Sequence, residues 1–311
     1  MKVLITGVGG FIGDHLIDML LSKGCNILGT DLGETNNGAD KRIPVKQCDV
    51  TNREQVELIL EEFKPDVIFH LAAQSWPDIS WQKPNLTMKV NIEGTINVYE
   101  SIKKLKLDPL VFIPCSGAEY GDLKAEEYPV KEEHNLMPIN PYGVSKVVQS
   151  MLAYQYYKNF NIRSITIRLF NASGPRRIKD VCSDFTKSAV MIEKGLIEPV
   201  MKVGNLESKR AITDVRDVMD AIWLLINTGK VGETYNICSP NAYSIRKILN
   251  LVLELTGINP QVWQDPTLMR PADEKIIMGD TKKLMSHTGW FAKISIENTL
   301  KDMISDWRLK L

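Results

Sequence analysis

Ser116, Tyr142 and Lys146 are the residues of this chain whose types and spacing could do chemistry together. Tyr142 and Lys146 stand four residues apart at the start of an amphipathic stretch, so a helix would place them on one face. Ser116 ends a short apolar run that predicts a strand. A lysine ammonium beside a phenol lowers the pKa of the phenol, so the tyrosine could accept or donate a proton near neutral pH. The serine hydroxyl could hold the same substrate oxygen, which suits hydride transfer at a carbonyl carbon.

A glycine-rich turn near the N-terminus predicts where the hydride carrier binds. Residues 4–13 read LITGVGGFIG, with glycines spaced G-x-x-G-x-x-G at Gly7, Gly10 and Gly13. The apolar run before the turn predicts a strand and the amphipathic pattern after it predicts a helix. The first N–H groups of that helix have no partner inside it and could hold a diphosphate. Glycine is needed because a Cβ would block the tight turn and the close approach of a dinucleotide.

Asp31 indicates which dinucleotide is expected. It ends the second expected strand, 18 residues after Gly13, where a carboxylate accepts hydrogen bonds from the ribose and repels the 2′-phosphate of NADP. Leu32 supplies no compensating cation, so NAD(H) is favoured and NADP(H) stays possible. Asp49 could contact the adenine amino group or belong to the cap of the helix that follows it. The other expected cofactor contacts are Phe11, Ile12, Val50, Leu71, Ala72 and Ala73.

The elements that must position these residues alternate between strand and helix. Strands are expected at 2–6, 26–30, 44–47, 67–71, 110–115 and 164–168, and helices at about 13–23, 52–62, 84–106 and 141–160. This alternation is typical of an α/β protein with a parallel sheet covered on both faces, and right-handed crossovers make it a doubly wound Rossmann sheet. Ligands bind at the carboxyl ends of such strands, where Ser116 lies.

After about residue 170 the pattern becomes less regular, and prolines divide the chain into shorter pieces. We therefore expect residues 1–170 to form the NAD(P)-binding Rossmann domain and residues 171–311 to form mainly a smaller, mixed substrate-binding domain. The segments near 211–238 are an exception, because they look like a helix and a strand that return to the first sheet.

The composition excludes several classes of function. The 38 basic and 38 acidic residues give no net charge and form no basic block, which argues against nucleic acid as the main partner. Five dispersed cysteines without C-x-x-C spacing fit reduced thiols, and no metal site is expected. The N-terminus leads directly into a core strand and no apolar run could span a membrane, so a cytoplasmic protein is expected.

Several motifs resemble those of the extended short-chain dehydrogenase/reductases, which act on nucleotide-activated sugars. They follow the family order over nearly the whole chain: TGVGGFIG, DVIFHLAA, NIEGT, CSGAEYG, PYGVSK and RLFNASGP. The resemblance implies Tyr142 as acid/base, Lys146 as its pKa-lowering partner and ribose ligand, and Ser116 as the group that orients the carbonyl. It also implies that Asn91 helps to fix the active-site helix and that Asn171 contacts the sugar diphosphate.

The C-terminal half is similar to a narrower group, the GDP-mannose 4,6-dehydratases and GDP-4-dehydro-6-deoxy-D-mannose reductases. The similar segments are VGNLESKRAITDVRD at 203–217 and LMRPADE at 268–274. The resemblance implies that Arg210 and Arg270 bind the diphosphate, with Asp273 nearby on the nucleotide or ribose; guanidinium groups clamp phosphate oxygens bidentately. The chain departs from the group, which usually carries Asp and an aromatic residue there, at Ala211 and Ile212.

The residues after Ser116 separate the two reactions of this group. Dehydratases remove water across C5 and C6 of the sugar and place an acidic pair directly after the serine or threonine. Here those positions are Gly117 and Ala118, which cannot transfer a proton. Glu119 should point elsewhere because side chains alternate on an extended chain, unless a bulge re-aims it. We therefore expect an NAD(P)H-dependent reductase of a nucleotide-linked 4-keto-6-deoxy hexose, with GDP as the favoured nucleotide and Tyr142 as the acid.

Other functions use the same residues. A nucleotide-sugar 4-epimerase keeps NAD bound and needs the same three side chains, and Asp31 suits it slightly better because many biosynthetic reductases prefer NADPH. A dehydratase would need an acidic group beyond Ser116, and a non-catalytic cofactor sensor would not need the intact set.

Apolar residues recur along both long helical stretches, 84–106 and 141–160. In the family the equivalent helices form a four-helix interface, so the resemblance implies a homodimer. Both apolar faces could instead belong to the core of the monomer.

Overall fold

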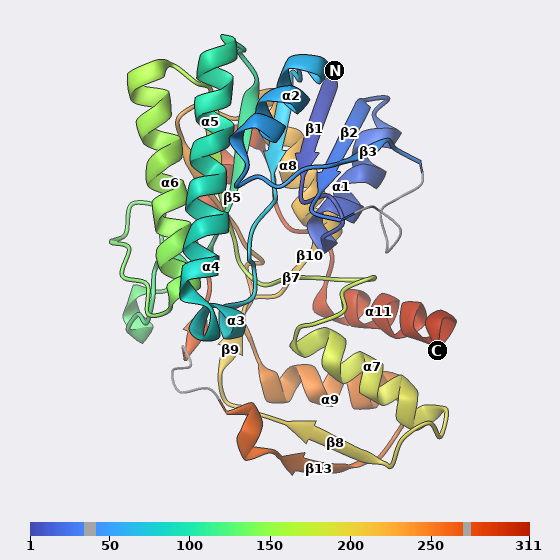
Figure 1. Cartoon of the computed structure of the whole chain (residues 1–311). Coiled ribbons are helices and arrows are strands. Elements are labelled where there is room, and N and C mark those ends of the chain that lie inside the picture. Colours follow the sequence, from blue (N-terminus) through green and yellow to red (C-terminus); the bar gives the residue numbers. More distant parts are fainter. Residues whose placement is uncertain (34–41, 270–274) are drawn as a thin grey trace.

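The computed structural model describes residues 1–33, 42–269 and 275–311. Seven parallel strands form its central sheet in the order β11-β6-β5-β4-β1-β2-β3 (Figure 1). Their bounds are Lys2–Thr6 (β1), Asn26–Asp31 (β2), Val45–Gln47 (β3), Val67–His70 (β4), Leu110–Ser116 (β5), Ser164–Leu169 (β6) and Thr234–Ile237 (β11). The six strands expected before residue 170 are confirmed, and their ends differ from the expectation by at most one residue.

Alternate residues of the strands face two different helical layers. Val3 and Ile5 of β1 pack against α1 (Phe11–Ser22) and α8 (Val215–Thr228). Leu4 packs on the opposite face. That face is covered by α2 (Arg53–Phe63), α5 (Gly94–Leu105) and α6 (Pro141–Phe160). Figure 1 shows α5 and α6 on one side of the sheet and α1 and α8 on the other. Because both faces are covered, the central strands are mostly apolar, as is usual in a doubly wound sheet.

The helical stretch expected at 84–106 is interrupted in the structure. It consists of α4 (Pro84–Met88), a π-helical turn (Lys89–Glu93) and α5. Asn91 lies in the π turn and is completely buried. Such single wide turns are frequent at functional sites, because they re-aim side chains that a regular helix would place elsewhere.

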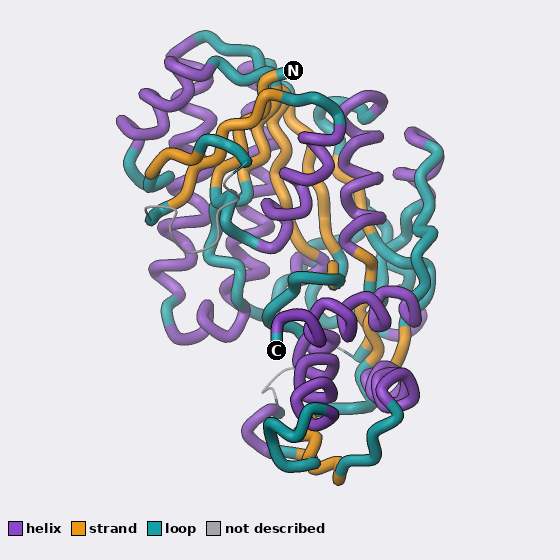
Figure 2. The backbone as a smooth tube through the Cα atoms, turned by 90° about the vertical axis from the view of Figure 1, so that its right-hand side faces the viewer, coloured by secondary structure: helices purple, strands orange, loops and turns teal. Residues whose placement is uncertain are grey.

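A second group of elements lies beyond the carboxyl ends of the central strands (Figures 1 and 2). Its helices are α7 (Val181–Glu193), α9 (Ile245–Thr256) and α11 (Ile296–Lys310), which share a core of their own. Its strands form three small sheets: β7 (Ala172–Ser173) with β10 (Thr213–Asp214), β8 (Val200–Val203) with β13 (Gln261–Gln264), and β9 (Lys209–Arg210) between β12 (Tyr243–Ser244) and β14 (Ile276–Ile277).

The chain returns from this group to the central sheet through α8 and β11. β11 pairs with β6 in parallel and forms the edge of the sheet. The division of the chain at residue 170 stays a prediction. The remaining short helices are α3 (Pro77–Gln82), α10 (Lys282–Thr288) and three 3-10 turns, Gly117–Glu119 (η2), Ala125–Glu127 (η3) and Pro266–Leu268 (η4).

The five cysteines are free thiols, four of them buried. Among the residues described, no cluster of side chains has the makeup of a metal site. None of the helices in the described ranges has the length and apolar character needed to cross a membrane.

Candidate active site

Tyr142 and Lys146 occupy the first two turns of α6. Asn140 caps this helix, since its side chain accepts a hydrogen bond from the Gly143 N–H at 2.7 Å, and Pro141 occupies the first helical position. Lys146 is buried, and its Nζ donates to the carbonyl oxygen of Pro114 at 2.8 Å. The same Nζ lies 5.7 Å from the ring centroid of Tyr142. The helix start therefore holds the phenol and the ammonium side by side at the end of β5.

Ser116 completes the group from the last position of β5. Its Oγ accepts from the Ala118 N–H at 3.2 Å, which starts η2. Its side chain is also hydrogen-bonded to Tyr142, and this bond lowers the pKa of the phenol, as does the charge of Arg177. Burial acts more strongly in the opposite direction, so the pKa of Tyr142 is raised above its ordinary value. The phenol is therefore protonated at neutral pH.

The net change in the pKa of Tyr142 is opposite in sign to the change expected from Lys146 alone. We expected the ammonium to lower the pKa of the phenol, but the pKa of Tyr142 is raised. Burial outweighs the polar partners of the ring, and the Lys146 ammonium is engaged with the Pro114 carbonyl. Burial also lowers the pKa of Lys146 itself, while the nearby Cys115 and Glu119 act to raise it.

Asn91 connects the active-site helix to the loop after β4. Its amide nitrogen donates to Ser145 Oγ at 2.9 Å and to the Gln74 carbonyl at 3.1 Å. Its oxygen accepts from the Gln74 N–H at 2.7 Å. Because Ser145 directly precedes Lys146, these bonds hold α6 in place, as the resemblance implied. Gln74 was not anticipated from the sequence, since nothing in its neighbourhood marks it as the partner of a residue in the next helix.

His70 at the end of β4 is a core residue and not an acid or base. It is completely enclosed, with Nδ1 2.9 Å from Thr6 Oγ1 and Nε2 3.1 Å from Thr95 Oγ1. Burial, with a smaller contribution from the charge of Lys146, lowers its pKa to about 3. The imidazole is therefore neutral and serves as a hydrogen-bonded link between β4, β1 and α5.

The glycine turn lies between β1 and α1 and fits a diphosphate. Gly7 has a φ of +66°, and a Cβ there would be 2.6 Å from Ala72 Cα. A Cβ at Gly13 would be 2.3 Å from the carbonyl oxygen of Val8. Gly10 differs, because a Cβ there would meet only the Gly7 oxygen at 3.5 Å, an ordinary contact. The protein's own packing thus explains the first and third glycines, whereas Gly10 keeps the exposed surface before α1 open. That open surface at a helix N-terminus is the cradle a diphosphate needs.

Asp31 lies at the end of β2, beside this turn. Its Oδ2 accepts from the Gly9 N–H at 2.9 Å, and its Oδ1 accepts from the Leu32 N–H at 2.8 Å. The carboxylate is half-buried and joins the glycine turn to β2. It therefore occupies the position expected for a ribose ligand, with its oxygens oriented by two backbone donors.

Asp49 lies in the turn that precedes α2 and stabilises this turn through its side chain. Its Oδ1 accepts from the Thr51 N–H at 2.9 Å and from the Thr51 hydroxyl at 2.8 Å, while Asn52 caps the helix. Of the other expected cofactor residues, Val50 is buried and the rest are half-buried. They lie where α1 begins and where β3 and β4 end: Phe11, Ile12, Val50, Leu71, Ala72 and Ala73. Their contacts with a cofactor stay predictions.

Two of the four expected substrate residues, Asn171 and Arg210, lie in the described part of the chain. Asn171 follows β6 with a φ of +42°, and its buried amide nitrogen has no hydrogen-bond partner among the residues that the structure describes. Arg210 is buried on β9, and its Nη1 donates to the Lys209 carbonyl at 2.9 Å. Arg270 and Asp273 lie outside the described residues. At the two positions that depart from the similar group, both side chains are in apolar cores: Ala211 and Ile212.

Glu119 points away from the site, as expected, but for a different reason. The chain leaves the extended conformation directly after Ser116 and forms η2, so strand alternation does not apply. The Glu119 side chain is completely buried, and its Oε2 accepts from Arg168 Nε at 2.9 Å. A side chain at position 117 would force the Phe170 ring to move, because a Cβ on Gly117 would be 2.8 Å from that ring.

Arg177 belongs to the site but was missed in the sequence. Its guanidinium carbon lies 4.8 Å from the ring centroid of Phe11 and 5.8 Å from that of Trp76. It therefore bridges the start of α1 and the loop after β4, close enough to Tyr142 for its charge to lower the pKa of the phenol. No spacing signal points to it, since the two rings that it contacts are far away in the sequence.

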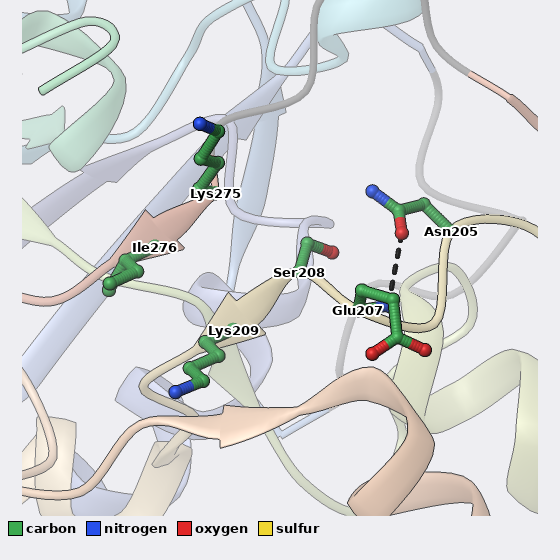
Figure 3. A pocket seen from close by; sticks show the side chains of 6 residues that line it. All are labelled: Asn205, Glu207, Ser208, Lys209, Lys275 and Ile276. Carbon is green, nitrogen blue, oxygen red and sulfur yellow. Dashed lines mark hydrogen bonds between the residues drawn. The ribbon is translucent and has the colours of Figure 1, made fainter. Parts of the chain in front are cut away.

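A surface hollow of about 370 Å³ lies beside the segment expected to bind the diphosphate. Its lining residues are Asn205, Glu207, Ser208, Lys209, Lys275 and Ile276. Figure 3 shows the side chains of Lys209 and Lys275 pointing away from each other, and the bond from the Glu207 N–H to Asn205 Oδ1, which measures 3.0 Å. The two cations do not converge, and the hollow contains none of the three expected catalytic residues.

Comparison with known proteins finds similar proteins that match over the full chain. GDP-6-deoxy-D-mannose reductase from Pseudomonas aeruginosa is 28% identical over 313 residues, covering 100% of this chain and 98% of the relative. The structure of RMD from Pseudomonas aeruginosa complexed with NADPH has a TM-score of 0.87 at 26% identity, covering 100% of this chain and 99% of that one. UDP-glucose 4-epimerase from Thermotoga maritima, solved with UDP-glucose, has a TM-score of 0.90 at 26% identity, with coverage of 100% and 99%.

The match that decides the family is to the family model of GDP-mannose 4,6 dehydratase. It extends over residues 4–303, from the first strand to the last helix. Among the similar solved structures, one is a complex with NADPH and another is a complex with NAD. The chain therefore belongs to the GDP-mannose 4,6 dehydratase family and is an NAD(P)-dependent oxidoreductase of the extended short-chain dehydrogenase/reductase type.

Proposed function

We propose that this protein reduces the 4-keto group of a GDP-linked 4-keto-6-deoxy hexose. The observation that carries the proposal is the pairing of a protonated Tyr142 with Ser116, while the neighbouring Glu119 carboxylate is buried and engaged by groups of the protein. The nearest acidic side chain in sequence, Glu119, is bonded to Arg168 inside the protein. A hydroxyl pair without a second base can protonate an alkoxide but cannot remove the C5 proton that dehydration requires.

The chain's own residues support this reaction step by step. When bound, the dinucleotide supplies a hydride to C4. Tyr142 donates its proton to the oxygen at C4, a role for which a raised pKa is suitable because the phenol must begin protonated. Ser116 holds the same oxygen by its hydroxyl, and the buried Lys146 ammonium lies beside the phenol to stabilise the tyrosinate that remains. The open surface at Gly10 and the carboxylate of Asp31 would hold the diphosphate and the ribose of the dinucleotide.

Of the two cofactors found in complexes of similar proteins, NAD(H) and NADP(H), we favour NAD(H) for this protein. The Asp31 carboxylate is oriented by Gly9 and Leu32 at the end of β2, where a 2′-phosphate would meet its negative charge. The same observation favours the second candidate function, a nucleotide-sugar 4-epimerase that retains NAD between two hydride transfers. A solved epimerase relative also binds NAD.

Binding of the nucleotide sugar is assigned to Asn171 and Arg210, together with Arg270 and Asp273. The buried amide nitrogen of Asn171 is the supporting observation, since a buried donor without a partner costs about 1–3 kcal/mol unless a ligand accepts from it. The GDP moiety is proposed from the similarity to the GDP-6-deoxy-D-mannose reductase.

We also propose that the protein is a homodimer. Apolar side chains on the outer faces of α4 and α6 are exposed: Leu86 by 45%, Val144 by 39% and Met151 by 59%. These faces belong to the two helical stretches expected to form the interface, and a second copy would remove them from water. A cytoplasmic location completes the proposal, because five free cysteines suit a reducing compartment.

The reductase is tested with purified protein, GDP-4-keto-6-deoxymannose, and NADH or NADPH. Oxidation of the added cofactor with formation of a 6-deoxyhexose product supports it. Tyr142→Phe should lower kcat by roughly a hundredfold to ten-thousandfold, the range of general acid catalysis. The matched control is Tyr99→Phe, which removes a buried hydroxyl bonded to Ser164 at 2.9 Å away from the site. Tightly retained NAD with no net oxidation of added NADH would replace the reductase by the epimerase, and an active Tyr142→Phe would refute both.

A further inference from the structure

The Glu119 carboxylate connects three elements that meet behind the proposed catalytic pair. Its Oε1 accepts from the Ser116 N–H at 3.1 Å, at the end of β5. Its Oε2 accepts from Arg168 Nε on β6 at 2.9 Å and from Ser150 Oγ on α6 at 2.8 Å. Ser150 lies one helical turn after Lys146, so the same carboxylate is bonded to the strand that ends in Ser116 and to the helix that carries Tyr142.

Burying this carboxylate has a cost in folding free energy, because the charge is removed from water. Glu119 is 0% exposed and Arg168 only 4%, and a buried ion pair is often no more stabilising than apolar residues of similar size. Arg168 is held in turn by the Tyr120 hydroxyl and the Glu132 carbonyl, at 2.8 and 2.9 Å. The charged donor to the carboxylate is therefore itself fixed by two further partners, which restricts the position of the pair.

We infer that Glu119 is a positioning residue, whose carboxylate holds the Ser116 end of β5 against α6 and so sets the approach of the Ser116 and Tyr142 hydroxyls. The inference rests on the proposed function of these two hydroxyls. The carboxylate is completely buried and its partners are groups of the protein, so Glu119 acts through Ser116 and α6. Small displacements matter here, since misplacing a reacting group by about 1 Å costs on the order of a hundredfold in rate.

The charge of Glu119 has a second effect on the same groups. The charged and titratable groups that face Tyr142 and Lys146 are Cys115 on β5, Glu119 on η2, His70 on β4 and Arg177 after β7. Among them, Glu119 acts to raise the pKa of Tyr142 and the pKa of Lys146. Removing its negative charge therefore lowers both pKa values, because tyrosinate becomes easier to form and the ammonium becomes harder to keep.

Glu119→Gln in the full chain separates this role from simple structural support. The amide keeps the size of the side chain and loses the charge. We expect kcat for reduction to fall about tenfold or more, with KM changed by less than about threefold, since the hydroxyl geometry matters mainly in the transition state. In the pH profile of kcat, we also expect the alkaline limb, where Tyr142 loses its proton, to move to lower pH by on the order of one unit.

The matched control is Glu132→Gln. Glu132 is also a partly buried carboxylate that accepts from a backbone N–H, that of Asn236 at 2.9 Å, but it does not act on Tyr142 or Lys146. Glu132→Gln should have the kcat of the wild type and the same alkaline limb in its pH profile of kcat. If Glu119→Gln and Glu132→Gln have equal kcat per folded molecule and equal alkaline limbs, the inference is overturned.

Two further measurements cover the remaining outcomes. If Glu119→Gln does not fold, Ser150→Ala decides, because it keeps the Glu119–Arg168 pair and releases only α6; a kcat lowered several-fold supports the inference and an unchanged kcat overturns it. If wild-type protein reduces no nucleotide sugar, the proposed function fails by itself. Titration of the Lys146 ε-carbon by nuclear magnetic resonance, assigned with Lys146→Met, then needs no substrate: a lower midpoint in Glu119→Gln supports the electrostatic link, and an unchanged midpoint overturns it.

Discussion

Replacing Gly10 and Gly13 separately by alanine should distinguish the cofactor role of the turn from its folding role. At Gly13 the new Cβ would lie 2.3 Å from the Val8 oxygen, well inside the 3.0 Å that real Cβ atoms keep, and both groups belong to the backbone of one tight turn. Overpacking of this kind lowers the free energy of unfolding by about 1–3 kcal/mol. Alanine offsets about 1 kcal/mol of this loss, because it forms helix more readily than glycine. At Gly10 the Cβ meets only the Gly7 oxygen at an ordinary 3.5 Å.

The two variants should therefore fail in different ways. Gly13→Ala should lower the unfolding temperature by a few degrees, at about 2 °C per kcal/mol for a chain of this size. Gly10→Ala should cost only about 0.5 kcal/mol as a poorer helix cap. Its Cβ blocks the surface over which the diphosphate approaches α1. Losing one hydrogen bond to a charged group, about 1.5–3 kcal/mol, raises the Kd for NADH roughly tenfold to hundredfold.

The measurements are thermal unfolding without cofactor and NADH titration by calorimetry, on both variants and the wild type. A Gly10→Ala protein that binds NADH with the wild-type Kd would refute the assignment of this turn as the diphosphate cradle. A Gly10→Ala protein as destabilised as Gly13→Ala would refute the reasoning from the Cβ contacts.

Three further predictions follow from single contacts. Gly117→Asp should lower stability by about 1–3 kcal/mol and create no dehydratase, because its Cβ would lie 2.8 Å from the Phe170 ring; an unchanged unfolding temperature would contradict this. Asp31→Asn keeps an oxygen for the Gly9 N–H and removes a negative charge. It should raise the NADPH/NADH ratio of kcat/KM about tenfold, and a constant ratio would exclude Asp31 as the discriminator. Because the pKa of His70 is about 3 in the folded protein and ordinary in the unfolded chain, the unfolded state binds more protons below about pH 6.5. Stability should therefore fall as the pH drops from there, by up to about 1.4 kcal/mol per unit, and urea unfolding that shows the same pH dependence in His70→Gln would count against it.

The central sheet was predictable because its determinants are local. The strands β1, β4 and β5 bury both faces, so each is a short apolar run, and helices such as α2 and α5 have an apolar stripe. The π-helical turn at Lys89–Glu93 was not predictable, since it depends on Asn91 reaching Gln74 and Ser145, residues of two other segments. The small sheets of the C-terminal half are pairs of two to four residues, too short to show a period.

The site was predictable where one element carries the spacing. Tyr142 and Lys146 share a helix, and the three glycines share one turn, so their relation is set by backbone geometry alone. Arg177 was missed because the two rings that hold it, Phe11 and Trp76, come from distant segments. The sign of the change in the pKa of Tyr142 was also missed, because burial depends on everything packed around the ring.

By itself, the sequence determined the doubly wound sheet, the glycine-rich turn between β1 and α1, and the helical spacing of Tyr142 and Lys146, because these follow from local pattern and from spacing within one helix or turn. Only the tertiary structure decided what surrounds them. It places the Phe170 ring against position 117 and buries the Glu119 carboxylate against Arg168. Burial also raises the pKa of Tyr142, so the phenol is protonated. These outcomes depend on contacts between segments up to about fifty residues apart, and no local pattern encodes the packing that brings them together.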